Sequence, residues 1–275
     1  MTLENKLVEI VKAHEESISD AAKNPFKDKW VSILGDSIST YNGWVPAGNS
    51  YYYPKDDVND VKKTWWHILL KKLGAKLCVN ESWNGRKVCD LKSVANSTYN
   101  AVGKLHRETG KTYKNLDGKD EVATEDIKPD IILVFLGIND YNGNVDLGDI
   151  TAFKHNINIE TATDFMQAYN TFICHVIATH YPKCQCYVME PAYVQTFGFQ
   201  EDNATGASLG EYQAGVRKVS EIVGTHCIHI SRICVHAQNW NDNLVNEDKI
   251  HPREIMMRKI ANQCYSEMLA SNCLE

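Results

Sequence analysis

The sequence predicts an α/β protein built on a parallel β-sheet with helices on both faces. Short apolar runs alternate along the chain with stretches of helical periodicity. The most apolar run, Ile131–Leu136, is typical of a central strand that is buried on both faces. Strands that alternate with helices favour parallel pairing, because each crossover returns the chain to the same end of the sheet.

Individual elements can be assigned in order. The predicted strands are Trp30–Leu34, Ala75–Val79, Ile131–Leu136, Gln185–Met189 and His226–Ile230. The predicted helices lie near residues 62–73, 87–105, 163–180, 208–223 and 254–270. Gly74 and Gly224 stand where a helix C-terminus needs a residue in the left-handed conformation. Pro129 and Asp130 mark the entry to the central strand.

The connecting segments are polar and rich in turn-forming residues. They cover roughly residues 38–61, 106–128, 140–162, 191–207 and 231–250. Most of them follow a strand, so they should gather beyond the carboxyl ends of the strands, where α/β sheets carry their functional groups. The segment 106–128 follows a helix instead and is expected on the opposite side.

Length and N-terminal pattern predict the domain organisation. A chain of 275 residues fits one domain, residues 1–275, with a catalytic core over residues 30–270. Apolar residues near helical spacing between residues 3 and 22 predict an amphipathic helix within an N-terminal extension, residues 1–24. The N-terminus lacks the apolar core of a signal peptide, and no apolar run approaches the ~20 residues of a membrane span.

Charge and cysteine content narrow the class of protein. The formal net charge is -6 with both signs well mixed, which argues against nucleic-acid binding and against an anionic membrane surface. The nine cysteines are an odd number, and many lie in apolar stretches, as in a cytoplasmic protein with reduced thiols. No metal-ligand spacing is present, so neither a metal nor an organic cofactor is expected.

Two short motifs follow predicted strands in the first half of the chain. Ser37, in Gly-Asp-Ser-Ile-Ser, comes straight after the first strand, where its hydroxyl and its own N–H can face one point. A serine that only caps the next turn is the alternative. Gly85 follows the second strand, and a glycine lets its N–H approach a reacting group closely. Taken alone the signal is weak, because a glycine in a loop is usually only a turn residue.

Two further motifs complete the set. Asn139 directly follows the central strand and can donate a side-chain N–H to an oxyanion, although an Asn-Asp turn is the alternative. Asp248 precedes His251 by three residues, close enough to meet it within one turn and to orient the imidazole. A helix cap beside Pro252 is the other interpretation. The four motifs together are much less probable as coincidences than any one alone.

As a set, these motifs resemble the GDSL or SGNH hydrolases, a family named for Ser, Gly, Asn and His in four blocks. Here the blocks are matched by Ser37, Gly85, Asn139 and His251. The resemblance implies a three-layer α/β/α flavodoxin-like fold, usually with a central five-stranded parallel sheet. It also implies a serine esterase with Ser37 as nucleophile, His251 as base and Asp248 as its partner. The Ser37 and Gly85 N–H groups and the Asn139 amide would then form the oxyanion hole.

The substrate is expected to be a small-molecule ester. Asp36, Trp83, Asp140 and Tyr141 adjoin the blocks and are predicted substrate-binding residues. Aromatic residues near the blocks, including Trp44 and Tyr51–Tyr53, favour a short acyl group on a carbohydrate or other small alcohol, although aromatic packing of long loops is as good an explanation. An acyltransferase, lysophospholipase or thioesterase would use the same site. A protein of another class, a catalytically silent binder on this fold, also stays open.

Two other motifs are expected to be decoys. Gly206–Gly210 fits the G-x-S-x-G pattern of a nucleophile elbow, but no strand precedes Ser208, which instead forms a predicted capping box with Glu211. Gly110-Lys-Thr resembles the end of a P-loop, but Leu105 stands where the first glycine is needed.

Overall fold

The structure is a computed structural model that describes residues 24–89, 97–149, 163–192, 202–233, 235, 239–245 and 247–272. The N-terminal helix predicted within residues 1–24 lies outside the described residues. Five parallel strands form the main sheet. They are β1 (Trp30–Gly35), β2 (Lys76–Asn80), β5 (Ile131–Phe135), β6 (Gln185–Met189) and β7 (His226–Ile228).

The strand order in this sheet is β2-β1-β5-β6-β7. The order reverses between β1 and β5, which is the switch point of a flavodoxin-like sheet and the usual place for a ligand site. Gly35 pairs with Phe135, which in turn pairs with Met189, so these three strands end level with one another. Residues that follow β1 and β5 therefore start side by side, directly at the switch point.

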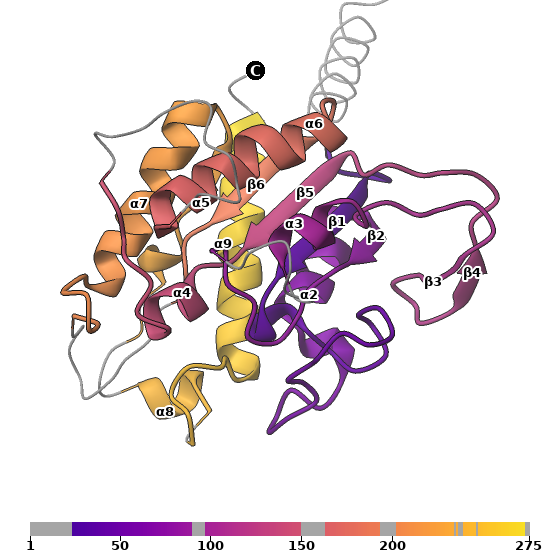
Figure 1. Ribbon diagram of the computed structural model, residues 1–275. Coiled ribbons are helices and arrows are strands. Elements are labelled where there is room, and N and C mark those ends of the chain that lie inside the picture. The colour runs from indigo at the N-terminus through magenta and orange to yellow at the C-terminus, as the bar shows by residue number, and fades with distance from the viewer. Residues whose placement is uncertain are drawn as a thin grey trace, which may run out of the picture.

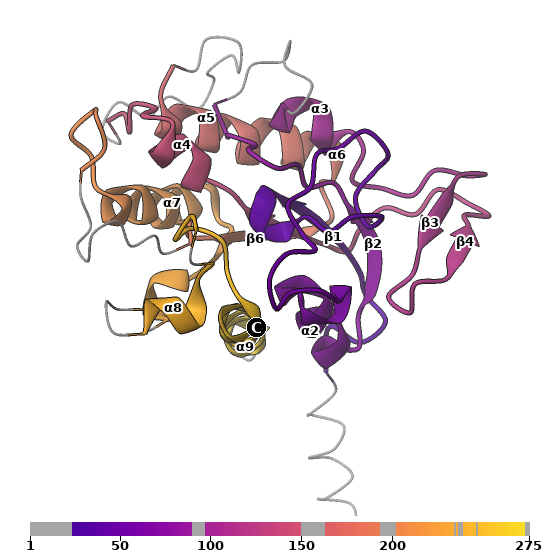
Figure 2. The same ribbon diagram turned by 90° about the horizontal axis from the view of Figure 1, so that it is seen from below.

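Helices cover both faces of the sheet. Helices α2 (Trp65–Leu73) and α9 (Glu254–Asn272) lie together on one face. The other face carries α3 (Thr98–Val102), α5 (Phe165–Thr171) and α7 (Leu209–Val223), as Figures 1 and 2 show. Helix α5 continues through a π-helical segment, Phe172–Ile177, into α6 (Ala178–His180). This arrangement confirms the predicted three-layer α/β/α class with a five-stranded parallel sheet.

Most helix boundaries agree with the expected ones, and their caps explain why. Gly74 and Gly224 end α2 and α7 in the left-handed conformation, with φ of 63° and 74°. Ser208 and Glu211 form the expected capping box at the start of α7. Thr64 separates α2 from a short 3₁₀ turn, Val61–Lys63, so the helix predicted over 62–73 begins later than expected.

The helix predicted over residues 87–105 is wrong at its beginning. Lys87–Cys89 are not helical, and the N–H groups of Val88 and Cys89 donate to the Asp140 carboxylate at 2.9 and 3.1 Å. A side chain from the other side of the switch point thus binds the N–H groups at the start of the predicted helix. Helix α3 itself covers only Thr98–Val102 among the described residues.

The segment 106–128 contains an antiparallel hairpin, β3 (Thr112–Lys114) and β4 (Asp120–Val122), which the sequence pattern did not predict. The hairpin lies beside the edge strand β2, where Figure 1 shows it projecting from the sheet. Its turn also reaches Trp44 in the loop after β1, since a Cβ at Gly118 would lie 3.7 Å from that ring. The segment 106–128 therefore lies along the β2 edge of the sheet, where its turn contacts α2 through the Asp117–Lys71 ion pair and approaches the loop after β1.

The remaining helices are short. Helix α4 (Ile138–Asn142) follows β5, and α8 (Trp240–Asn243) precedes the loop that leads to α9. No helix among the described residues is long and apolar enough to cross a membrane. Cys78, Cys89, Cys184, Cys186, Cys227 and Cys264 are free thiols.

Candidate active site

Ser37 lies at the carboxyl end of β1, in the first position of a 3₁₀ helix, Ser37–Ser39. The Asp36 carboxylate caps this helix by accepting the Ile38 N–H at 3.0 Å. Gly35 is required before the turn, because a Cβ there would lie 2.4 Å from Ser39 Oγ. Ser37 is only 3% exposed, and neither its N–H nor its hydroxyl has a hydrogen-bond partner in the described part of the chain.

Asp248 and His251 form a hydrogen-bonded pair in the loop before α9. His251 Nδ1 and Asp248 Oδ2 lie 2.8 Å apart, and the backbone N–H groups of Ile250 and His251 donate to Asp248 Oδ1 at 2.9 and 3.0 Å. Burial on its own would raise the pKa of Asp248. The hydrogen bonds from His251, Tyr52 and Ile250 outweigh burial and hold that pKa well below its usual range. Asp248 is therefore an anion that fixes the orientation of the imidazole.

The other imidazole nitrogen, His251 Nε2, is buried and has no hydrogen-bond partner. Buried polar atoms are rarely left unpaired, so such an atom calls for an explanation. Ser37 Oγ is likewise unpaired, so the two groups are not bonded to each other here. Catalytic hydrogen bonds are often long or absent without substrate.

Gly85 and Asn139 follow β2 and β5, the two strands that flank β1. Gly85 has a φ of 80°, and its N–H donates to no backbone carbonyl among the described residues. Asn139 is in the first turn of α4. Gly137, just before this helix, has a φ of 118°, and a Cβ at this position would lie 2.8 Å from the Pro191 side chain. Asn139 Nδ2 donates one hydrogen bond to the Arg86 carbonyl oxygen, 3.1 Å away, and this bond connects the Gly85 loop to α4. The second hydrogen remains for another acceptor.

The predicted substrate-binding carboxylates are engaged within the protein. Asp140 is 0% exposed and accepts the two N–H groups of Val88 and Cys89. Asp36 is buried as the cap of the Ser37 turn, and burial raises its pKa to about 7. The Ile38 N–H opposes this rise in pKa, the Asp140 carboxylate adds to it, and the buried Arg86 also opposes it. Both carboxylates hold the loops that carry the candidate oxyanion groups.

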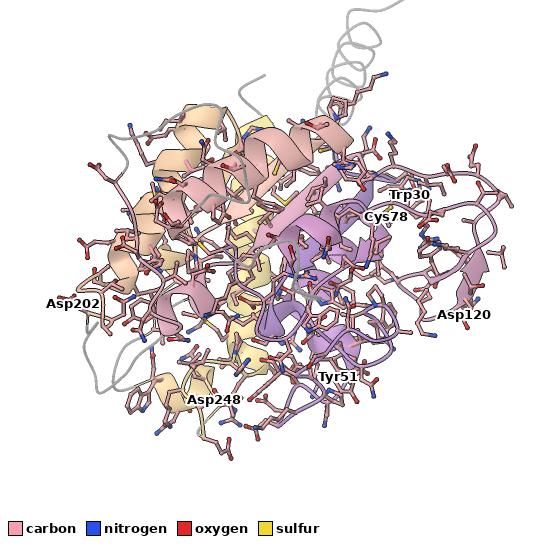
Figure 3. The ribbon with its side chains drawn as sticks, viewed as in Figure 1. Trp30, Tyr51, Cys78, Asp120, Asp202 and Asp248 are labelled. Atoms are coloured by element: carbon pink, nitrogen blue, oxygen red, sulfur yellow. The ribbon has the colours of Figure 1, made fainter. Side chains whose placement is uncertain are left out.

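The aromatic residues near the blocks divide into two sets. Trp44 packs against Trp66, with ring centroids 5.7 Å apart, and Tyr141 packs against Tyr212 at 5.7 Å. Packing therefore accounts for these rings. Tyr51 is 46% exposed and Trp83 is half-buried, so they are the aromatic residues of this group that can meet a ligand. Figure 3 shows Tyr51 and Asp248 at one end of the molecule, and Trp30, which begins β1, at the other.

Tyr52 is the site residue whose role the sequence did not predict. Its ring stacks on the His251 imidazole, with centroids 3.4 Å apart and an interplanar angle of 9°. Its hydroxyl donates to Asp248 Oδ2 at 2.5 Å. The run of tyrosines at 51–53 was the available signal, but nothing local indicates that the second one meets a residue 196 positions away.

One described cluster has metal-ligand chemistry: Glu190 and His229, which directly follow β6 and β7, and Cys227 within β7. Its donors are already engaged. The Glu190 carboxylate binds Arg217 and the Ser231 N–H, and His229 Nδ1 lies 2.9 Å from the Glu267 carboxylate. Burial raises the pKa of the Cys227 thiol to about 12, so it is protonated. The contacts of the cluster are those of a structural hydrogen-bond network.

The predicted decoys have the contacts of ordinary structural residues. Ser208 Oγ lies 2.9 Å from the Glu211 carboxylate as part of the cap of α7, and residues 203–207 directly before it form a turn instead of a strand. Gly110 has a φ of 80° and donates to the Ala123 carbonyl at the base of the hairpin. Neither motif contributes to the switch point.

The fold and the placement of polar groups at the switch point define a flavodoxin-like α/β protein with its functional residues beyond β1 and β5. Comparison with known proteins assigns the family. The model of the GDSL-like lipase/acylhydrolase family matches residues 29–268. The chain therefore belongs to this family, and it is an ester hydrolase.

Solved structures agree with this assignment. A GDSL-like lipase structure from Bacteroides ovatus is 25% identical, with a TM-score of 0.62 over 89% of this chain and 99% of that one. A second, from Bacteroides uniformis, is 24% identical, with a TM-score of 0.60 over 88% and 96%. An acetyl-xylooligosaccharide esterase variant from Geobacillus shares the fold at 14% identity, with a TM-score of 0.52 over 88% and 95%. No curated protein sequence matches the chain.

Proposed function

We propose that the protein is a serine esterase in which Ser37 is the nucleophile, His251 the general base and Asp248 the residue that orients His251. The observation that carries this proposal is the unpaired, buried His251 Nε2, whose opposite nitrogen is held by an anionic carboxylate. An imidazole in this arrangement can accept a proton at one defined atom.

The reaction proceeds in two displacements. Ser37 Oγ attacks the ester carbonyl carbon while its proton passes to His251 Nε2, and the carbonyl oxygen becomes an oxyanion. The Ser37 and Gly85 N–H groups and the free Asn139 Nδ2 hydrogen donate to that oxygen. The intermediate expels the alcohol, which takes the proton from His251, and leaves an acyl-serine. Water then attacks the acyl carbon and gives a proton to His251, and the acid departs as His251 returns that proton to Ser37 Oγ.

The proposed substrate is a short acyl ester, an acetyl group in particular, on a carbohydrate or other small alcohol. Tyr51 and Trp83 can offer aromatic surface to such an alcohol. The fold shared with an acetyl-xylooligosaccharide esterase agrees with this class. Acyl transfer to an alcohol would use the same residues, and product analysis with added alcohols separates the two reactions.

Hydrolysis of p-nitrophenyl acetate tests the nucleophile. Ser37→Ala should abolish turnover and labelling by a fluorophosphonate, which needs an activated serine, while the protein stays folded. Ser208→Ala is the matched control, because it removes the serine of the G-x-S-x-G motif at the start of α7, and it should keep wild-type activity. Turnover that survives Ser37→Ala would refute the assignment. An inactive and unlabelled wild type would favour a binding protein on this fold.

A further inference from the structure

Tyr52 contacts both members of the Asp248–His251 pair. Its hydroxyl donates to Asp248 Oδ2 at 2.5 Å, the same oxygen that lies 2.8 Å from His251 Nδ1. Its ring covers the imidazole at 3.4 Å, nearly parallel to it. The phenol and the imidazole therefore share one acceptor atom, and the tyrosine ring blocks movement of the imidazole toward the face that it covers.

The backbone of Tyr52 is tied to the nucleophile turn. Its N–H donates to Thr40 Oγ1 at 2.9 Å, and the Thr40 hydroxyl donates to the Ser37 carbonyl at 2.8 Å. A continuous route of hydrogen bonds thus runs from Ser37 through Thr40, Tyr52 and Asp248 to His251. It joins the two ends of the chain that supply the proposed nucleophile and base.

We propose that Tyr52 is a positioning residue that holds the Ser37 turn and the Asp248–His251 pair in register and lowers the basicity of His251. This inference rests on the proposed function. A donor on Asp248 Oδ2 spreads the charge of the carboxylate, so less of it stabilises an imidazolium.

The surroundings keep the Tyr52 hydroxyl protonated, so it remains a donor. Burial, followed by the hydrogen bond to Asp248 and the charge of that carboxylate, raises the pKa of the phenol well above its usual value. Two other titratable groups lie against the Tyr52–His251 stack: Lys55, whose Nζ is 5.0 Å from the Tyr52 ring centroid, and the buried Tyr53. The charges of Asp56 and Glu247 also raise the pKa of Tyr52, and those of Asp36 and Asp57 raise the pKa of Tyr53.

Tyr52→Phe tests the effect on basicity, because it keeps the stacked ring and removes only the donor. We expect the pKa of the His251 imidazole, followed by NMR titration, to rise by about one half to one pH unit. In the pH profile of kcat/KM, the acid limb should move to higher pH by the same amount. At a pH below this limb, kcat/KM should therefore fall about three- to tenfold, with KM within about twofold.

Tyr53→Phe is the matched control. The hydroxyl of this neighbouring buried tyrosine donates to the Pro252 carbonyl at 2.6 Å and to no carboxylate. It should shift the imidazole titration by less than about 0.2 pH unit, since the charge on Asp248 is unchanged. Equal shifts in the two variants, or none in Tyr52→Phe, would overturn the proposed tuning of His251.

Thr40→Val tests the positioning part, because it breaks the link to Tyr52 and leaves the Tyr52 hydroxyl in place. We expect kcat to fall about tenfold with the imidazole titration unchanged. Unchanged kcat in a folded Thr40→Val protein would refute the link. The NMR titration needs no turnover, so a failure of wild type to hydrolyse esters would count against the proposed function and would leave the inference on Tyr52 testable by itself.

Discussion

At the scale of single residues, the site is defined as much by missing hydrogen bonds as by those it makes. His251 Nε2 is buried and unpaired and Ser37 Oγ has no hydrogen-bond partner among the described residues, whereas Asp36, Asp140 and Asp248 each accept backbone N–H groups. Unpaired buried groups lower stability and persist where the geometry serves another purpose. The anionic and capping residues around them keep the unpaired atoms in place.

Asn139→Ala should lower kcat about 10²–10³-fold and leave KM nearly unchanged, because an oxyanion donor acts on charge that develops only in the transition state. Steady-state kinetics with p-nitrophenyl acetate gives both constants. The variant also loses the bond to the Arg86 carbonyl, so its free energy of unfolding is measured by urea denaturation beside the kinetics to show that it stays folded. An effect confined to KM would refute the oxyanion role.

Residue-level prediction from sequence worked where partners are close along the chain. The three-residue spacing of Asp248 and His251 predicted a contact, and the structure has it at 2.8 Å. Tyr52 could not be assigned in this way, because its partner lies far along the chain and only folding brings the two together. The catalytic roles themselves remain predictions.

At the scale of elements, the edge of the sheet depends on one buried arginine. Arg107 is 2% exposed, and its guanidinium donates to the carbonyls of Leu77 and Cys78 on β2 and of Lys114 on β3, at 2.7 to 3.1 Å. It also packs 4.8 Å from the Trp30 ring centroid. Edge strands need their free backbone groups covered, and here one side chain satisfies carbonyls of β2 and attaches the hairpin.

Arg107→Met should therefore lower the free energy of unfolding by about 3 kcal/mol, since it leaves several buried carbonyls without a donor. Urea denaturation measures this change. Lys111→Met is the control in the same hairpin, because Lys111 makes only an exposed pair with Glu108, and its loss should change the free energy of unfolding by less than about 0.5 kcal/mol. Similar losses in both variants would contradict the role of Arg107.

Over the whole molecule, buried carboxyl groups set how stability depends on pH. Burial raises the pKa of Asp36 from 3.8 to about 7 and also raises the pKa of Glu81. Between about pH 4 and pH 7, the folded protein therefore binds more protons than the unfolded chain. Its free energy of unfolding falls as the pH rises through this range. The low pKa of Asp248 acts in the opposite sense, with stability lost below about pH 4.

Asp36→Asn should remove the larger part of this pH dependence, because the amide oxygen can still accept the Ile38 N–H but carries no charge to bury. We expect the variant to gain up to about 4 kcal/mol over wild type at pH 8 and little at pH 4.5. Urea denaturation at the two pH values measures it. Asp120→Asn, at an exposed carboxylate on the hairpin, should leave the difference between the two pH values unchanged. A wild-type stability that rises from pH 5 to 7 would contradict the prediction.

The sequence by itself determined the parallel sheet, the helix caps at Gly74, Ser208 and Gly224, and the motifs that follow β1, β2 and β5. These features depend on periodicity and on neighbours within one turn, which a sequence displays directly. Tertiary structure alone decided the hairpin beside β2, the non-helical start of the 87–105 segment and the contact of Tyr52 with Asp248. Each of these three features depends on a hydrogen bond from or to a side chain far along the chain. Local propensity cannot predict such a bond, because it forms only when folding makes the two segments neighbours.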